Sequence, residues 1–124
     1  MEGIGILFLL SIKHVIADYF LQQSWMIKDK GTYGAQGGIA HASIHTIGSF
    51  IVLFPFFNPV LIFVLSVLDG VAHYHIDYVK SNYWKNNNLT KTDTEFWMVH
   101  GVDQFAHYLT YVLMASVLVM YFYG

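Results

Sequence analysis

The sequence predicts an all-α polytopic membrane protein, with four transmembrane helices in an up-down bundle that forms a single domain over residues 1–124. Three observations predict this class. Of the 124 residues, 56% are hydrophobic and only 11% are charged, whereas about a quarter of the residues of a soluble domain are charged. Four apolar segments are long enough to cross about 30 Å of hydrocarbon. Their apolar residues also run round each helix, whereas a soluble helix keeps one apolar stripe.

Turn and loop residues separate the four segments. The predicted spans are approximately Ile4–Gln22, Ile39–Phe57, Pro59–Lys80 and Phe96–Tyr123. Charged residues and glycines within 28–38 separate the first two spans, and Asn58-Pro59 predicts a tight turn before the third. The polar, asparagine-rich segment Ser81–Thr94 precedes the fourth span. Because these connections link successive spans, we expect each span to run antiparallel to the next in the bundle.

The composition also excludes several classes of protein. The chain has no cysteine, so neither a disulfide nor a thiolate metal site can form. The formal net charge is −2 and no basic run is present, so we expect no nucleic-acid partner. The expected partner is the lipid bilayer, and the sequence leaves a homo-oligomer open.

Nine ionisable residues interrupt the predicted spans. They are His14, Asp18, His41, His45, Asp69, His73, Asp77, Asp103 and His107. A charged side chain at the centre of a membrane helix costs about 2.5–3.5 kcal/mol, so such residues mark function by default. In an up-down bundle, the ends of the first and third spans meet the beginnings of the second and fourth, and the nine residues lie there. The topology therefore predicts one polar layer near one membrane face.

These residues have the chemistry of a metal site. Residues four apart project from one helix face, and facing pairs build the carboxylate–histidine metal sites of four-helix bundles. The predicted ligands are His14, Asp18, His41, His45, His73, Asp77, Asp103 and His107. Zinc is the expected ion, with manganese or iron as alternatives. Four aspartates against Lys13 leave a buried charge of −3. One or two divalent ions would balance it, and the number of donors favours two.

Asp69 and Lys13 are the candidates for a catalytic role. Asp69 is predicted to be a ligand or a general base. Lys13 is predicted to face an anionic substrate group, such as a lipid phosphate, and the alternative is that it snorkels to the interface or pairs with a nearby aspartate. His75 points away from His73 and Asp77 on the same helix, so it is interpreted as an interfacial histidine.

The lysines predict the orientation in the membrane. Lys28, Lys30, Lys80, Lys85 and Lys91 all lie in the first and third connections. By the positive-inside rule, these connections are cytoplasmic and both termini lie outside. The polar layer is then expected to face the cytoplasm.

The polar motifs resemble those of a family of small bacterial and phage membrane proteins known only as a domain of unknown function. The motifs are His14-Val-Ile-Ala-Asp18, His41 with His45-Thr46, His73-Tyr-His75-Ile-Asp77-Tyr-Val-Lys80 and Asp103-Gln104-Phe-Ala-His107. The resemblance covers nearly the whole chain and implies a place in the bacterial inner (cytoplasmic) membrane. In motif style the family is similar to inner-membrane proteins described as metal-dependent hydrolases.

The expected function is therefore that of a metal-dependent membrane hydrolase acting on a lipid or lipid-linked substrate. A proton or metal-ion transporter or channel is the main alternative, because Asp and His chains also serve as proton relays. A di-iron oxygenase and a purely structural His–Asp network are the others. The sequence names neither the substrate nor the number of metal ions.

Overall fold

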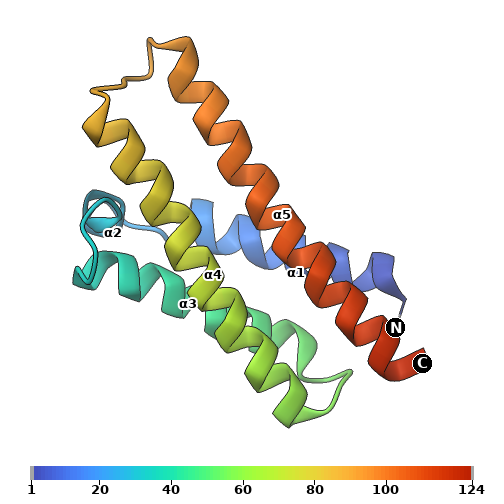
Figure 1. Ribbon diagram of the computed structural model, residues 1–124. Coiled ribbons are helices and arrows are strands. Elements are labelled where there is room, and N and C mark those ends of the chain that lie inside the picture. The colour runs from blue at the N-terminus through green and yellow to red at the C-terminus, as the bar shows by residue number, and fades with distance from the viewer. Residues whose placement is uncertain (1, 124) are drawn as a thin grey trace.

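The computed structural model describes residues 2–123, and all regular elements in that range are helical. They are α1 (Gly3–Val15), the π-helix η1 (Ile16–Phe20), α2 (Ser24–Asp29), α3 (Gln36–Leu53), α4 (Pro59–Asn86) and α5 (Thr94–Tyr123) (Figure 1). The all-α class is thus confirmed.

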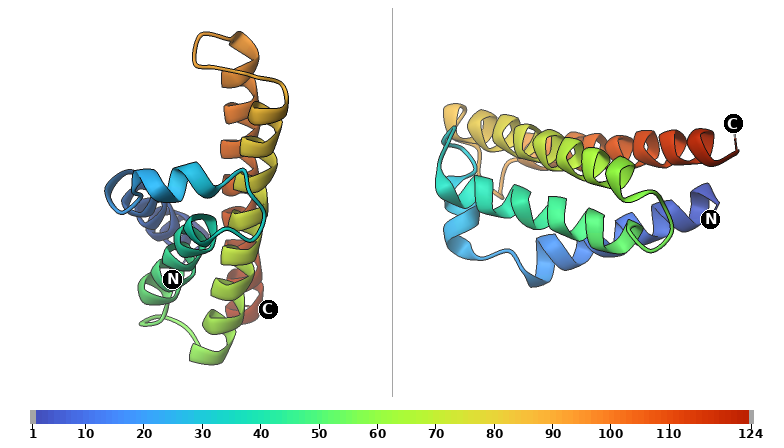
Figure 2. Two further views of the ribbon diagram at one scale, coloured as in Figure 1. Left: turned by 90° about the vertical axis from the view of Figure 1, so that its left-hand side faces the viewer. Right: turned by 90° about the horizontal axis from the view of Figure 1, so that it is seen from below.

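Four long helices form a closed ring in which each packs on two others. The neighbouring pairs are α1 with α3, α3 with α4, α4 with α5, and α5 with α1. The two termini and the α3–α4 turn lie at one end, and α2 and the α4–α5 connection lie at the other (Figure 2, right). Seen from the side, the α1–α3 pair crosses the α4–α5 pair at a steep slant (Figure 2, left).

Three segments are long and apolar enough to cross a membrane: Gly3–Phe20, Pro59–Asn86 and Thr94–Tyr123. The helix of the second predicted span, α3, is outside this set, because polar residues such as His41, His45 and Ser49 dilute its apolar character. By length and composition, the described chain therefore has three helices that could cross a membrane. A fourth span formed by α3 stays a prediction.

The boundaries differ from the prediction at several places. The first span was expected to be one helix to Gln22, but it changes to a π-helix after Val15. The connection after it contains the short helix α2. The third span continues as helix beyond Lys80 to Asn86. At its other end, the Asn58 side chain accepts hydrogen bonds from the first backbone N–H groups of α4, which is the expected cap of a helix that starts with proline.

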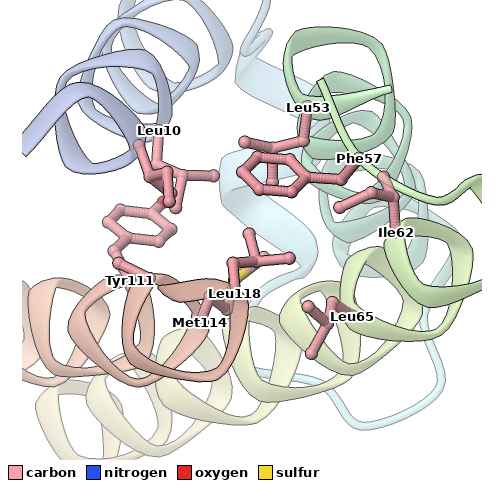
Figure 3. Packing of buried hydrophobic residues seen from close by; sticks show 10 residues of the cluster. Leu10, Leu53, Phe57, Ile62, Leu65, Tyr111, Met114 and Leu118 are labelled. Atoms are coloured by element: carbon pink, nitrogen blue, oxygen red, sulfur yellow. The ribbon is translucent and has the colours of Figure 1, made fainter. Parts of the chain in front are cut away.

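The bundle interior is divided into an apolar half and a polar half. The apolar half lies toward the termini, where residues from all four long helices pack together (Figure 3). Its members with no exposed surface are Ile6, Leu10, Leu53, Ile62 and Leu118. The polar half lies toward α2. The outer surface is strongly apolar, with Val102 70% and Phe105 67% exposed. Buried polar residues under an apolar surface suit a lipid environment.

The backbones of α3 and α4 approach closely at Gly70. A Cβ atom added to Gly70 would lie 1.8 Å from Thr46 Oγ1 and 3.2 Å from the Ala42 carbonyl oxygen. Small residues permit such close packing between membrane helices. This contact fixes the two helices that carry His41, His45, His73 and Asp77.

Candidate metal centre

The first long helix changes type where it carries Asp18. After Val15 the chain continues as the π-helix Ile16–Phe20, and the Leu21 N–H donates to the Ile16 carbonyl oxygen at 3.0 Å. Single π turns within α-helices are rare, and those that occur are frequently found at functional sites. The wider turn changes the direction of Asp18 relative to an uninterrupted α-helix. Its carboxylate reaches the histidines of α3.

A first group of side chains joins Asp18 to His41 and His45 of α3 and to His73 of α4. Their candidate ligand atoms all lie within 4.8 Å of one another. Asp18 Oδ1 is 3.0 Å from His41 Nε2 and 2.9 Å from His45 Nε2. His73 Nε2 is 3.2 Å from His41 Nε2 and 3.9 Å from Asp18 Oδ1. The three histidines are buried and Asp18 is partly exposed.

A second group shares His73 and adds residues of α4 and α5. Asp77 Oδ2 is 3.1 Å from His73 Nε2, and Asp77 Oδ1 is 3.2 Å from His107 Nε2. Asp103 Oδ2 lies 3.5 Å from His107 Nε2. Asp77 Oδ2 is also 3.6 Å from His41 Nε2, so the two groups are adjacent in one buried layer.

The donor set fits a divalent metal ion. With bonds of about 2.0–2.1 Å, tetrahedral zinc ligands lie about 3.3 Å from one another. The separations of 2.9, 3.0 and 3.2 Å in the first group are near this value. Within residues 2–123, the buried Oδ1 atom of Asp103 also lacks a hydrogen-bond partner, and Asp77 Oδ2 has ion-pair contacts only. Buried polar atoms in this condition are costly, and a bound cation would satisfy them.

His14 lies beside the first group. Its Nε2 atom is 3.0 Å from Asp18 Oδ2, and its Nδ1 atom is 2.7 Å from the hydroxyl of Tyr111. Tyr111 is buried and extends from α5 toward α1 (Figure 3). The structure thus brings together all eight residues predicted as ligands. Their binding of metal stays a prediction.

Lysines change the charge balance that the sequence predicted. Lys13 Nζ is 3.0 Å from Asp69, Lys30 Nζ is 3.2 Å from Asp77, and Lys80 Nζ is 3.0 Å from Asp103. The expected −3 counted Lys13 alone and becomes −1 when Lys30 and Lys80 are included with neutral histidines. Among the described residues, Asp18 is the only one of these four aspartates without a lysine partner. This balance favours one divalent ion over two.

Asp69 and Lys13 form an ion pair between the polar and apolar halves. Asp69 Oδ2 accepts from Lys13 Nζ at 3.0 Å and from Ser49 Oγ at 2.6 Å. Lys13 Nζ also donates to the Tyr111 hydroxyl at 3.1 Å. Asp69 and Lys13 are 1% and 3% exposed, so the geometry agrees with the pairing alternative for Lys13. Their catalytic roles stay predictions. Sequence reasoning missed Ser49 and Tyr111, which carry no signal beyond their residue types.

His75 and His100 lie outside the two groups. His75 is exposed, and its Nε2 atom is 2.9 Å from the hydroxyl of Tyr33; its interfacial position stays a prediction. His100 is partly exposed and lies 3.5 Å from Lys80 Nζ at the edge of the second group. Sequence reasoning also missed Lys30, because a loop lysine gives no sign of which aspartate it will reach.

Comparison with known families gives one match. The family DUF3307, described as a protein of unknown function, matches residues 6–123. The chain belongs to the DUF3307 family. This confirms the expected membership in an uncharacterised family, and the family's description assigns no activity. No curated protein and no solved structure matches the chain.

Proposed function

We propose that this chain is a metal-dependent integral membrane hydrolase that acts on a lipid or lipid-linked substrate. The observation that carries the proposal is the convergence of imidazole Nε2 atoms from α3, α4 and α5 on the carboxylates of Asp18 and Asp77. His41 and His73 also place two ring nitrogens 3.2 Å apart, which either an N–H···N hydrogen bond or a shared metal ion would produce. The carboxylates of Asp18 and Asp77 beside this pair favour the metal ion.

The proposed chemistry is hydrolysis at a divalent ion, for which zinc is the first candidate. A bound ion of this kind lowers the pKa of water to about 7 and polarises the scissile group. The chain's own part is to hold the carboxylates in place and to keep the site buried. The charge balance favours one ion, in place of the two-metal centre that the number of donors suggested.

The surroundings support a substrate that approaches from the lipid. A groove of about 570 Å³ lies between α4 and α5, and its walls include Val79, Met98 and Val102. Its lining also includes Lys80 and Asp103, and Asp103 contacts His107 of the second group. The groove thus joins the apolar outer surface to the edge of the site.

We place the chain in the bacterial inner membrane with four spans, α3 being the fourth. The distribution of loop lysines supports a cytoplasmic site and external termini. The transport alternative requires polar side chains through the other half of the bundle. In the described part of the chain, that half is filled by the apolar cluster around Leu10, Leu53 and Leu118, which supports the hydrolase over a path through a single protomer.

Elemental analysis of protein purified in detergent without chelator tests this proposal. We expect about one equivalent of transition metal, which is lost in a His73→Ala variant and kept in a His75→Ala variant, because His75 lies outside the groups. Hydrolysis of lipid phosphate and lipid ester substrates in mixed micelles, with and without chelator, then tests the activity. Absence of metal from a folded helical protein would contradict the proposal and favour proton-linked transport.

A further inference from the structure

A chain of buried hydrogen bonds runs from Lys13 to Asp18 and divides the histidines into two classes. Lys13 Nζ lies 3.0 Å from Asp69 Oδ2, 3.1 Å from the Tyr111 hydroxyl and 3.0 Å from His45 Nδ1. An ammonium group has three donors and no acceptor, so all three interactions are donations by Lys13. His45 Nδ1 is therefore an acceptor. Its ring hydrogen lies on Nε2, because a neutral imidazole carries one N–H.

Tyr111 imposes the same tautomer on His14. The Tyr111 oxygen accepts from Lys13, which leaves its own hydrogen free to be donated. His14 Nδ1 lies 2.7 Å from that oxygen and is the acceptor that the described residues offer to this hydrogen. His14 Nδ1 is then the acceptor, and the ring hydrogen of His14 also lies on Nε2.

The two Nε2–H groups lie beside the two oxygens of one carboxylate, and that of His45 donates a hydrogen bond to it, whereas within residues 2–123 that of His14 forms none. His45 Nε2 is 2.9 Å from Asp18 Oδ1, and His14 Nε2 is 3.0 Å from Asp18 Oδ2. A ring nitrogen that carries hydrogen has no lone pair for a metal ion. We infer that His45 is a positioning residue that holds Asp18 by this hydrogen bond, that the Nε2–H of His14 lies against the same carboxylate, and that neither histidine is a metal ligand.

His41 and His73 belong to the other class. Within residues 2–123, the Nδ1 atom of each is buried without a hydrogen-bond partner, so no donor at Nδ1 fixes the ring hydrogen on Nε2. Their Nε2 atoms lie 3.2 Å apart, and the carboxylates of Asp18 and Asp77 lie beside them. A metal ion that binds Nε2 of His41 or His73 requires the ring hydrogen on Nδ1, and no donor of the described residues opposes that tautomer, in contrast to His14 and His45. The assignment rests on the metal site proposed above and narrows its ligand set.

Histidine ¹⁵N NMR in detergent tests the tautomers directly. In the metal-free protein we expect His14 and His45 to carry hydrogen on Nε2, with each signal assigned by its loss in the corresponding histidine-to-glutamine variant. On addition of Zn²⁺ alone, the Nε2 signals of His41 and His73 should shift as ligands, whereas His14 and His45 should keep their N–H. A metal-bound signal at His14 or His45 would overturn the inference.

Matched glutamine variants give a second, independent readout. Glutamine retains an N–H donor but replaces the imidazole ligand. His45→Gln should keep the Zn²⁺ stoichiometry of the wild type with roughly 10–100-fold weaker affinity, the usual effect of losing a partner that orients a ligand. His41→Gln should lose stoichiometric binding. Equal loss of Zn²⁺ in both variants, with helical content unchanged, would refute the assignment.

The two hypotheses fail in different ways. If the wild type binds no Zn²⁺, the proposed hydrolase site is wrong, but the tautomers of the metal-free protein still decide this inference. Hydrogen on Nδ1 of His14 or His45 in that protein would then overturn it. If Zn²⁺ binds and both histidines ligate it, the inference fails and the proposed function stands.

Discussion

The buried ion pair of Lys13 and Asp69 predicts a specific pattern of stability in single and double variants. The two side chains are 3% and 1% exposed and their charged atoms are 3.0 Å apart, so water cannot compensate either charge when the other is removed. Removing one partner of such a buried pair costs about 3–5 kcal/mol, whereas replacing both with neutral groups of similar volume is often close to neutral.

Asp69→Asn changes the charge with little change in volume and leaves Lys13 uncompensated. We expect it, and separately Lys13→Met, to lower the free energy of unfolding by about 3–5 kcal/mol. The double variant should lie within about 2 kcal/mol of the wild type, because neither charge is left alone and the changes are confined to the hydrogen bonds with Ser49, Tyr111 and His45. The two effects would then be strongly non-additive.

Unfolding of the detergent-solubilised protein by sodium dodecyl sulfate, followed by circular dichroism, measures these differences. Lys28→Met is the matched control, because Lys28 is exposed and its replacement should change stability by less than about 0.5 kcal/mol. The reasoning is refuted if the single variants match the control. It is also refuted if the double variant is destabilised by the sum of the single effects.

Three further predictions concern packing, metal and the buried tyrosine. Gly70→Ala should cost about 1–3 kcal/mol because its Cβ has no room, while Gly101→Ala, with open space around it, should be neutral or slightly stabilising in the same unfolding assay. Zn²⁺ at 100 times its dissociation constant should stabilise the wild type by about 2.7 kcal/mol, and thermal melting should show no such gain for Asp18→Asn. Tyr111→Phe should weaken Zn²⁺ affinity by roughly 10-fold in calorimetry, whereas the half-exposed Tyr108 should tolerate the same change. A Zn²⁺ affinity equal in both tyrosine variants would count against the chain of bonds through His14.

The convergence of the polar residues was predictable because it depends on two regular features. Helical spacing places His41 with His45, and His73 with Asp77, on one face, and antiparallel order brings those faces to one level. Both are properties of ideal helices, so the sequence carries them directly. The same regularity explains why an all-α class followed from composition and segment length.

The remaining features depend on contacts between distant residues. The π turn around Asp18 breaks the ideal spacing on which the prediction relied. Lys30 reaches Asp77 from a loop, and Lys80 reaches Asp103 across the bundle. The sequence separation of neither pair indicates that its two residues are in contact. Together, the two lysines change the expected charge of the polar layer from −3 to −1. The slanted crossing of the helix pairs likewise depends on how side chains fit, as the contact of Gly70 with Thr46 illustrates.

The π turn at Ile16–Phe20 has a consequence for changes in chain length. A π turn closes its hydrogen bonds over one residue more than an α turn, so deletion of one residue there can restore an ordinary α-helix without breaking the backbone ladder. The helix would survive such a deletion, but Asp18 would point in another direction. We therefore expect the helix to fold after deletion of one residue in this segment, whereas the metal site, which needs Asp18 in its present direction, should be lost.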